Sequence, residues 1–317
     1  MSDPLDVLII GGGPAGLTAA LTLARQLHTV AVFDCGTYRN DAAKYQHMVL
    51  TWDHKEPSAF RSAARENILG QYETVKVYPT TIDTVKSLEN GLFEAVDSNS
   101  KAWVGRKLVL ASGVEDIMPN IEGFQQCWGS GIFHCFFCKG FEERGSESSG
   151  LIATDALASV PHAMHAGRHA LQLCTSVTFY TNGSEDLTRE FENALTNTPE
   201  MNVDSRRIKK LVKGPNGAEV IVCFEDGTEK IEGFLGAAPK MKQRAPFADQ
   251  LALELNPGGE ITTKLPFMQT SMRGVFAAGD CGSAMKIAAN ALSTGAAVGA
   301  GVSAQILAEK FDHKPLF

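Results

Sequence analysis

Two cysteines separated by two residues are the clearest chemical signal in the chain. Cys135 and Cys138 enclose two phenylalanines, with His134 before the pair and Lys139 after it. A CxxC pair is close enough to form a disulfide, and a nearby cation or helix N-terminus lowers the pKa of one of its thiols. The spacing therefore predicts a redox-active pair. His134 is a candidate base toward an incoming thiol. A purely structural role is the alternative for His134. Lys139 could stabilise a thiolate or an anionic oxygen species, and a solvated side chain is the alternative.

Zinc binding is the other chemistry that a CxxC pair offers. A structural zinc site needs a second pair of ligands, and the sequence has no other CxxC and no CxH. Redox chemistry is therefore favoured. The remaining cysteines are predicted to be buried small hydrophobic residues: Cys35, Cys127, Cys174, Cys223 and Cys281.

A glycine-rich turn near the N-terminus predicts a dinucleotide site. It follows a predicted strand at 5–10, opens a predicted helix at 15–27, and is answered by an acid after the strand at 30–33. In this arrangement the glycines allow a tight turn, approach of a pyrophosphate and close helix packing, while the acid holds a ribose hydroxyl. The predicted contacts are Gly11, Gly13, Pro14, Ala15, Gly16 and Asp34.

A second acid near the C-terminus favours FAD over NAD. A strand is predicted over 274–280, with Gly279 and Asp280 at its end, and a helix is predicted over 286–308. An acid placed here suits a ribityl hydroxyl, which NAD lacks, although a helix N-cap is the alternative role for Asp280. The N–H groups of Ile287 and Ala288 are predicted to face the pyrimidine edge of the flavin.

Strands and helices alternate along the chain, which predicts an α/β fold. Further strands are predicted at 74–78, 92–97, 107–111, 150–153, 177–180, 218–224 and 228–234, with a helix at 156–173. The simplest organisation is an FAD-binding domain made of 1–115 and 243–317. A second domain, 116–242, is inserted into it and carries the cysteine pair.

Composition limits the kinds of partner. The 317 residues suffice for two α/β domains, and a net charge of −7 argues against a nucleic acid partner. The N-terminus has no basic region before an apolar one, and glycine, serine or asparagine interrupts the longest apolar stretches. We expect a cytoplasmic protein with no membrane partner.

The glycine turn, the segment 111–113 and the segment 274–280 resemble the FAD domain of the low-molecular-weight thioredoxin reductases. The resemblance covers essentially the whole chain, including the position of the CxxC in an inserted domain. It implies two Rossmann-like domains, with the FAD domain discontinuous and the smaller one inserted, and a homodimer with one FAD per subunit. It adds Ala111 to the FAD contacts.

The second nucleotide site of a thioredoxin reductase is missing. After the strand at 150–153 the chain continues with Thr154 and Asp155 and has no glycine triplet. The next strand ends without an arginine pair for a 2′-phosphate, because Arg206 and Arg207 lie well downstream. The inserted domain is therefore predicted to be vestigial, with NADPH binding lost.

A second resemblance is to the gliotoxin-oxidase family, and it rests on 133–138, 38–40 and 50–54. It implies a dithiol oxidase that forms a disulfide in a small natural product of the epidithiodiketopiperazine type. Electrons would pass from the substrate dithiol to Cys135–Cys138, then to FAD and to O2, releasing H2O2. Cys135 would exchange with substrate and Cys138 would face the flavin, while Arg39 and Asn40 would join the FAD contacts. Where that family has histidine after the second cysteine, this chain has Lys139.

Two alternative functions stay open at this point. The first is an NADPH-dependent disulfide reductase of thioredoxin reductase type, and the second is a non-catalytic flavin-binding redox sensor.

The role of three histidines is also open. His162, His165 and His169 share one face of the helix at 156–173. A plain helix face is favoured for them over the lining of a substrate cavity and over a metal site.

Overall fold

The computed structural model describes residues 3–195 and 197–317, which divide into two compact units. The first unit contains the residues up to Glu115 together with Lys242–Phe317, and the second is Asp116–Met241. Each unit is described by itself. Strands β7 (Val114–Ile117) and β16 (Lys240–Gln243), at the two places where the chain passes between the units, pair with each other.

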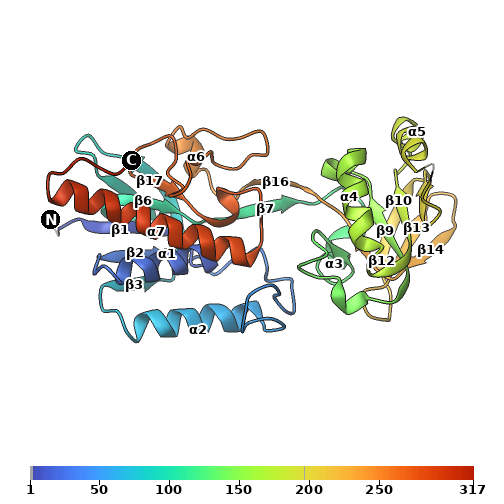
Figure 1. The fold of residues 1–317 in the computed structure, drawn as a ribbon, viewed down its shortest axis with the longest axis horizontal. Helices are drawn as coiled ribbons and strands as arrows, with labels where there is room; N and C mark the ends of the chain where they lie inside the picture. Colours follow the sequence, from blue (N-terminus) through green and yellow to red (C-terminus); the bar gives the residue numbers. More distant parts are fainter. Residues whose placement is uncertain (1–2, 196) are drawn as a thin grey trace. The chain divides into compact units, whose positions relative to one another are not determined.

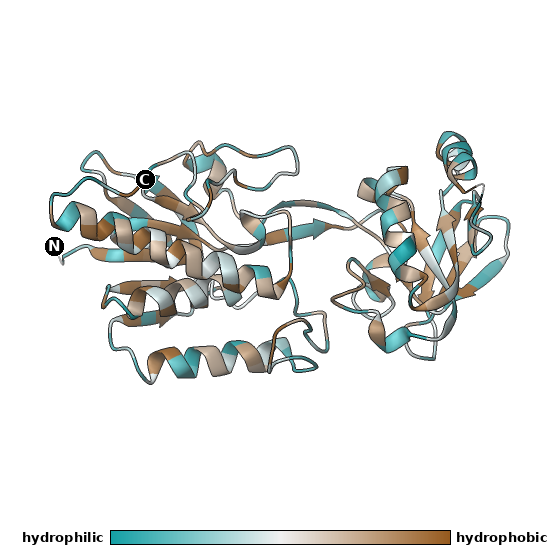
Figure 2. Cartoon of the chain, viewed as in Figure 1, coloured by the Kyte–Doolittle hydropathy of each residue, from teal (hydrophilic) through white to brown (hydrophobic). Residues whose placement is uncertain are grey.

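The first unit is built on a seven-stranded sheet in the order β3-β2-β1-β6-β5-β4, with β17 also paired to β6. Strands β1, β2, β3, β6 and β17 are parallel, while β4, β5 and β6 pair in antiparallel fashion. The strands are β1 (Leu5–Ile10), β2 (Val30–Phe33), β3 (Val75–Tyr78), β4 (Ile82–Ser87), β5 (Phe93–Asp97), β6 (Ala102–Leu110) and β17 (Val275–Ala277). Strands β2 and β17, the last four residues of β1 and the last three of β6 are apolar and buried, as expected where both faces of a parallel sheet are covered. The strands of this sheet are mostly brown in Figure 2.

Helices α1 (Pro14–Ala24) and α7 (Ala288–Lys310) lie side by side in this unit (Figure 1). Glycines on α7 allow the contact: a Cβ on Gly295 would lie 2.3 Å from the carbonyl oxygen of Ala15. A Cβ on Gly299 would lie 2.5 Å from Cβ of Thr22. Helix α7 is long and apolar enough to cross a membrane, but 56% of its apolar window is buried inside the protein, as in a core helix. Helix α2 (Pro57–Leu69), short helix α6 (Phe247–Gln250) and the turn η3 (Gly279–Cys281) complete the unit.

The second unit has a five-stranded parallel sheet in the order β11-β10-β9-β15-β8. These strands are β8 (Ile132–Phe133), β9 (Ser146–Ile152), β10 (Cys174–Tyr180), β11 (Met201–Asp204) and β15 (Leu235–Gly236). A separate antiparallel sheet contains β12 (Ile208–Lys213), β13 (Val220–Phe224) and β14 (Glu229–Glu232). The helices are α3 (Phe124–Cys127), α4 (Val160–Ala170) and α5 (Glu185–Ala194), with short turns η1 (Phe141–Glu143) and η2 (Asp155–Ala158). Parallel strands alternating with helices confirm the predicted α/β class.

The helix predicted over 156–173 was wrong at both ends. The structure has the 3-10 turn η2, an extended residue at Ser159, and only then α4, which ends at Ala170. Pro161 explains the start, because proline lacks an N–H group and fits only the first turn of a helix. The apolar pattern continues across that break, so periodicity alone did not reveal it.

Candidate active site

The glycine turn between β1 and α1 forms a cradle whose three glycines serve different purposes. A Cβ on Gly11, where φ is +119°, would lie 2.1 Å from the carbonyl oxygen of Ala111. A Cβ on Gly16 would lie 1.9 Å from the carbonyl oxygen of Gly11. Around a Cβ on Gly13, by contrast, no atom of the described chain comes within 4 Å. The first and third glycines therefore permit close packing, and the second leaves room for a ligand, as the motif predicts.

The first turn of α1 presents its main-chain amides to this space. Gly13 is the N-cap, Pro14 follows it, and no described side chain caps the helix. Uncapped N–H groups and the helix dipole favour an anion at this end. The turn thus fits the pyrophosphate of a dinucleotide.

Asp34, predicted to hold a ribose, follows β2 and is 7% exposed. Its carboxylate accepts hydrogen bonds from the Gly36 amide at 3.0 Å, from the Tyr38 hydroxyl at 2.6 Å, and from the Arg65 guanidinium. Burial, reinforced by Asp34, raises the pKa of Tyr38 to about 12, so this hydroxyl stays a donor. Arg65 was not predicted as a partner of Asp34, because it lies on α2, far from Asp34 along the chain.

The predicted contacts from the two ends of the chain meet in the first unit. Arg39 Nη1 lies 3.3 Å from Asp280 Oδ2, and the Asn40 side chain accepts a hydrogen bond from Arg61 at 3.1 Å. The Gly279 amide donates to the Thr294 hydroxyl on α7 at 3.0 Å.

The N-cap role considered for Asp280 was wrong. Asp280 lies within η3, and the N-cap of α7 is Ile287. Helix α7 begins at Ala288 and has no side-chain cap among the described residues. Its first amides are therefore not capped by any described side chain, and the contact of the Ile287 and Ala288 amides with the flavin stays a prediction. Taken together, the cradle, the uncapped helices and the acids at Asp34 and Asp280 fit FAD.

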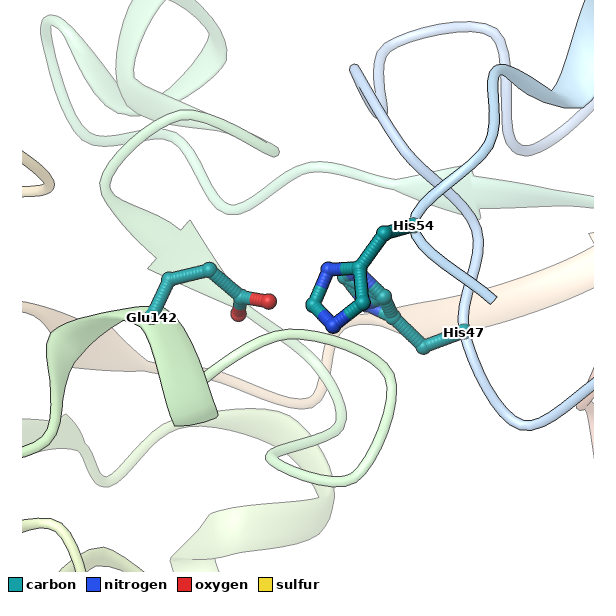
Figure 3. A group of neighbouring side chains, drawn as sticks. All are labelled: His47, His54 and Glu142. Atoms are coloured by element: carbon teal, nitrogen blue, oxygen red, sulfur yellow. The ribbon is translucent and has the colours of Figure 1, made fainter. Parts of the chain in front are cut away.

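The segment at 50–54 belongs to a tight loop of the same unit. The rings of His47 and His54 lie close together (Figure 3), and their centroids are 4.6 Å apart. Asp53 fixes the loop by accepting a hydrogen bond from the Met48 amide at 2.8 Å. Glu142, also drawn in Figure 3, belongs to the second unit.

In the second unit, Cys135 and Cys138 form a disulfide with their Cα atoms 5.2 Å apart. Strand β8 delivers the pair into a turn in which the Lys139 amide donates to the Cys135 carbonyl at 3.0 Å. The Cys138 amide donates to Cys135 Sγ at 3.1 Å. An N–H donor at this distance stabilises negative charge on that sulfur, as at a helix N-terminus.

The two phenylalanines between the cysteines have different surroundings. The Phe136 ring packs edge-on against Phe234 with centroids 5.5 Å apart. A Cβ on Gly236 would come 2.7 Å from the Phe136 ring, so glycine is required there. Phe137 is 64% exposed, and its ring centroid lies 4.8 Å from that of His169. Phe136 therefore anchors the turn, whereas Phe137 is presented outward.

A cavity of about 200 Å³ opens beside the disulfide within this unit. Cys135 lines it together with three histidines, His134, His165 and His169. The rest of the lining is apolar: Phe133, Phe136, Phe137, Leu151, Leu157, Ala166 and 236–238. Because β8, β9 and β15 end at this cavity, it lies at the carboxyl edge of a parallel sheet, where α/β proteins commonly bind ligands.

His134 and Lys139, the residues on either side of the CxxC pair, make different contacts. His134 is exposed, lines the cavity, and has its ring centroid 5.9 Å from that of Trp128. The Lys139 ammonium donates to the Gly129 carbonyl and lies 5.2 Å from the centroid of Phe133.

The three helix histidines separate into a pair and a single residue. His165 and His169 line the cavity with their ring centroids 4.6 Å apart. His162 Nδ1 instead lies 3.0 Å from Ser159 Oγ, one turn earlier. Within the described ranges, the three do not form a cluster able to hold a metal. The favoured plain helix face thus holds for His162, whereas the other two line a cavity.

The turn that would cradle NADPH has no glycine and carries η2 instead. Asp155 begins η2, and Leu157 of η2 is 6% exposed and packs in the core of the second unit. Arg206 and Arg207 lie well downstream in the sequence and were not expected at the end of the second strand, but Arg207 does lie there. A Cβ on Gly183, just after β10, would lie 2.8 Å from the Arg207 side chain. Arg206 is bound to Asp204.

The prediction of five buried cysteines is right for three. Cys127, Cys223 and Cys281 are buried, and burial raises the pKa of Cys281 to about 11. Cys174 is half-buried, and burial likewise raises its pKa to about 11. Cys35 is exposed, because it directly follows Asp34 into the loop after β2.

Comparisons with known proteins agree with this geometry. The family model described as pyridine nucleotide-disulphide oxidoreductase matches residues 5–295. "Thioredoxin reductase tcpT" of Claviceps purpurea is 43% identical over 317 residues, spanning 100% of this chain and 98% of its own length. "Thioredoxin reductase aclD" of Aspergillus oryzae is also 43% identical, spanning 99% of each. The solved structure of an oxidoreductase from Agrobacterium tumefaciens is 30% identical with a TM-score of 0.83, covering 96% of this chain and 99% of its own.

These matches confirm the predicted thioredoxin reductase type of fold and the FAD requirement of the family, and they are consistent with the resemblance to the gliotoxin oxidases. The chain belongs to the pyridine nucleotide-disulphide oxidoreductase family and is a thioredoxin reductase-like, FAD-dependent oxidoreductase.

Proposed function

We propose that this protein is a dithiol oxidase that closes a disulfide in a small sulfur-containing metabolite of the epidithiodiketopiperazine type, with O2 as the final electron acceptor. One observation carries the proposal: Cys135 opens onto an apolar cavity at the sheet edge, while the turn that would cradle NADPH holds Leu157 instead. The disulfide lines a cavity for a small molecule, and the inserted domain has no phosphate cradle for NADPH. We therefore infer that the small molecule, and not NADPH, donates the electrons.

Thiol–disulfide exchange accounts for the chemistry at the cysteines. A substrate thiolate attacks Cys135 Sγ, the Cys135–Cys138 bond breaks, and the electron pair leaves on Cys138 as a thiolate. The second substrate thiol then attacks the substrate sulfur of the mixed disulfide. Cys135 departs as a thiolate and the substrate disulfide closes. The substrate has lost two electrons and two protons, and the electrons reside on the two cysteine sulfurs.

Main-chain geometry favours Cys135 in the second step. Its sulfur accepts the hydrogen bond from the Cys138 amide at 3.1 Å, which stabilises a thiolate there. A thiol of lower pKa is the better leaving group in exchange. The substrate-facing sulfur is thus the one prepared to leave.

The FAD would be held by the glycine cradle at 11–16, with Asp34 toward the ribose and Asp280 toward the ribityl chain. The chemistry that FAD supplies when bound is acceptance of two electrons from the cysteine pair and their transfer to O2, which gives H2O2. The resemblance to thioredoxin reductases supports a homodimer as the working form, which sedimentation of the yellow protein would test.

A second candidate, an NADPH-dependent disulfide reductase, draws on the position of Arg207 beside Gly183. A cation after the second strand is where a 2′-phosphate would be recognised. The turn at 154–158 opposes this candidate, because a pyrophosphate has no glycine-lined approach there.

Turnover in air tests the proposal. The FAD-loaded protein is mixed with dithiothreitol, and oxygen uptake, H2O2 and oxidised dithiol are measured. We expect one H2O2 for each disulfide formed, with no nucleotide added. Dithiol oxidation that requires NADP+, or that proceeds without oxygen uptake, would reject the oxidase in favour of the reductase.

A further inference from the structure

We propose that His169, backed by His165, is the group that takes a proton from a substrate thiol in the cavity beside Cys135, and that Phe137 selects apolar dithiols there. This inference rests on the proposed function and assigns the site and the residues that carry out its exchange chemistry.

The proton balance favours such a group. Each disulfide closed releases two thiol protons, and a thiol of pKa about 8.5 is mostly protonated at neutral pH. His134 precedes Cys135 and lines the cavity, so it is placed to serve one thiol. A second imidazole in the cavity would take the proton of the other thiol, and an imidazole has a suitable pKa for this.

The geometry of α4 supplies that second imidazole. His169 is half-buried and lines the same cavity as Cys135, with its ring centroid 4.8 Å from that of Phe137 in the CxxC turn. His165 is exposed, one turn earlier, with its ring centroid 4.6 Å from that of His169. An inner imidazole next to an outer one offers a route for the proton from the cavity to solvent.

The volume and the lining of the cavity indicate the size and polarity of the ligand. Its volume of about 200 Å³ suits a compact molecule rather than a protein loop. Its lining is mostly apolar, and the 64% exposed ring of Phe137 stands beside the reactive sulfur. An exposed aromatic side chain at a cavity rim gains free energy by covering an apolar ligand. The substrate class is therefore a compact dithiol with an apolar or aromatic body.

The test uses the FAD-loaded protein and follows the anaerobic reduction of the flavin by dithiothreitol and by 1,2-benzenedimethanethiol. His169→Ala should reduce the rate by at least about tenfold at pH 7, toward the 10²–10⁴ typical of a lost general base. The loss should shrink as pH approaches the thiol pKa, and added imidazole should restore part of the rate. His162→Ala is the matched control, since His162 lies on the same helix and contacts Ser159 instead.

Phe137→Ser should raise KM for the aromatic dithiol about tenfold or more, while KM for dithiothreitol changes little. Reduced thioredoxin should reduce the wild-type flavin far more slowly than either dithiol. A His169→Ala protein with FAD bound that matches His162→Ala at pH 7, or one that imidazole does not rescue, would overturn the proton role. Faster reduction by thioredoxin would overturn the substrate class. In each case reduction of the wild type by small dithiols would still report separately on the proposed function.

Discussion

The main-chain amide of Cys138 donates a hydrogen bond to Cys135 Sγ across 3.1 Å, so the two ends of the redox pair are not equivalent. Negative charge on Cys135 is stabilised by that N–H group, and Cys135 also lines the cavity. The resemblance to the gliotoxin oxidases gives the flavin-facing role to Cys138. Local hydrogen bonding, the cavity and the resemblance thus favour the same division of roles.

The division of roles predicts opposite spectra for two single variants. Cys135→Ser and Cys138→Ser should each abolish dithiol turnover and keep FAD bound, since exchange needs both sulfurs. If Cys138 has the flavin-facing role that the resemblance implies, Cys135→Ser should show a long-wavelength thiolate-to-flavin charge-transfer band, because the remaining Cys138 thiolate would face the flavin. Cys138→Ser should lack it. Absorbance spectra of the two proteins decide the point, and a band in Cys138→Ser alone would reverse the assignment.

The glycine cradle predicts different defects at two neighbouring glycines. Gly13→Asp should leave the fold intact, because no described atom lies within 4 Å of a Cβ there, but its carboxylate should repel the pyrophosphate and empty the site of FAD. Gly16→Ala should instead destabilise the fold, because its Cβ would lie 1.9 Å from the Gly11 carbonyl oxygen. Thermal unfolding and the flavin absorbance of purified proteins separate the two effects. Full FAD occupancy in Gly13→Asp would refute the cradle.

His134→Ala tests whether the residue before Cys135 is also a base. The rate of flavin reduction by a dithiol should fall at pH 7 by about 10²–10⁴-fold, with FAD binding unchanged. The deficit should narrow as pH rises toward the thiol pKa, since the substrate then ionises unaided. Stopped-flow reduction across pH 6 to 9 measures this. A rate within about threefold of wild type at pH 7, below the range for base catalysis, would assign His134 to structure.

Buried His28 should make the free energy of unfolding of the first unit depend on pH. Burial lowers its pKa from the ordinary 6.5, against the opposing effect of Asp6. The unfolded chain therefore takes up this proton more readily than the folded one. The contribution of His28 is fully present above pH 6.5 or so and is lost as the pH falls through the lowered pKa of the folded state.

Replacing His28 should therefore flatten the acid side of the stability curve. The free energy of unfolding of His28→Gln should depend less on pH between 7 and 5 than that of wild type, by at most about 1.4 kcal/mol per pH unit for one proton. Urea denaturation at several pH values measures the slope, with exposed His313→Gln as control. Equal slopes in wild type and His28→Gln would contradict the prediction.

The sequence was enough to predict the features that depend on short-range spacing. The glycine turn, the acid after β2 and the CxxC each lie within a few residues of the element that positions them. Features that depend on contacts across the fold escaped prediction. Arg65 reaches Asp34 from α2, and Arg207 reaches the end of β10 because parallel pairing brings β11 beside it.

Two further features of the site could not be predicted from the sequence. Pro161 sets where α4 begins, so His162 falls in the first turn and bonds to Ser159, while the cavity reaches only His165 and His169. A run of histidines at helical spacing does not reveal how far a cavity extends along the helix. The sequence also does not show that Gly236 on β15 must lack a side chain because the Phe136 ring of the CxxC turn packs against it.

In the proposed function, electrons enter this protein from a small dithiol and not from NADPH. The most direct measurement is anaerobic mixing of the FAD-loaded protein with stoichiometric NADPH or with excess dithiothreitol, following loss of the flavin absorbance. We expect the dithiol to bleach the flavin and NADPH to leave it oxidised over the same time, because the turn at 154–158 offers no glycine-lined cradle for a pyrophosphate. Rapid bleaching by NADPH would contradict the account and make the protein a reductase.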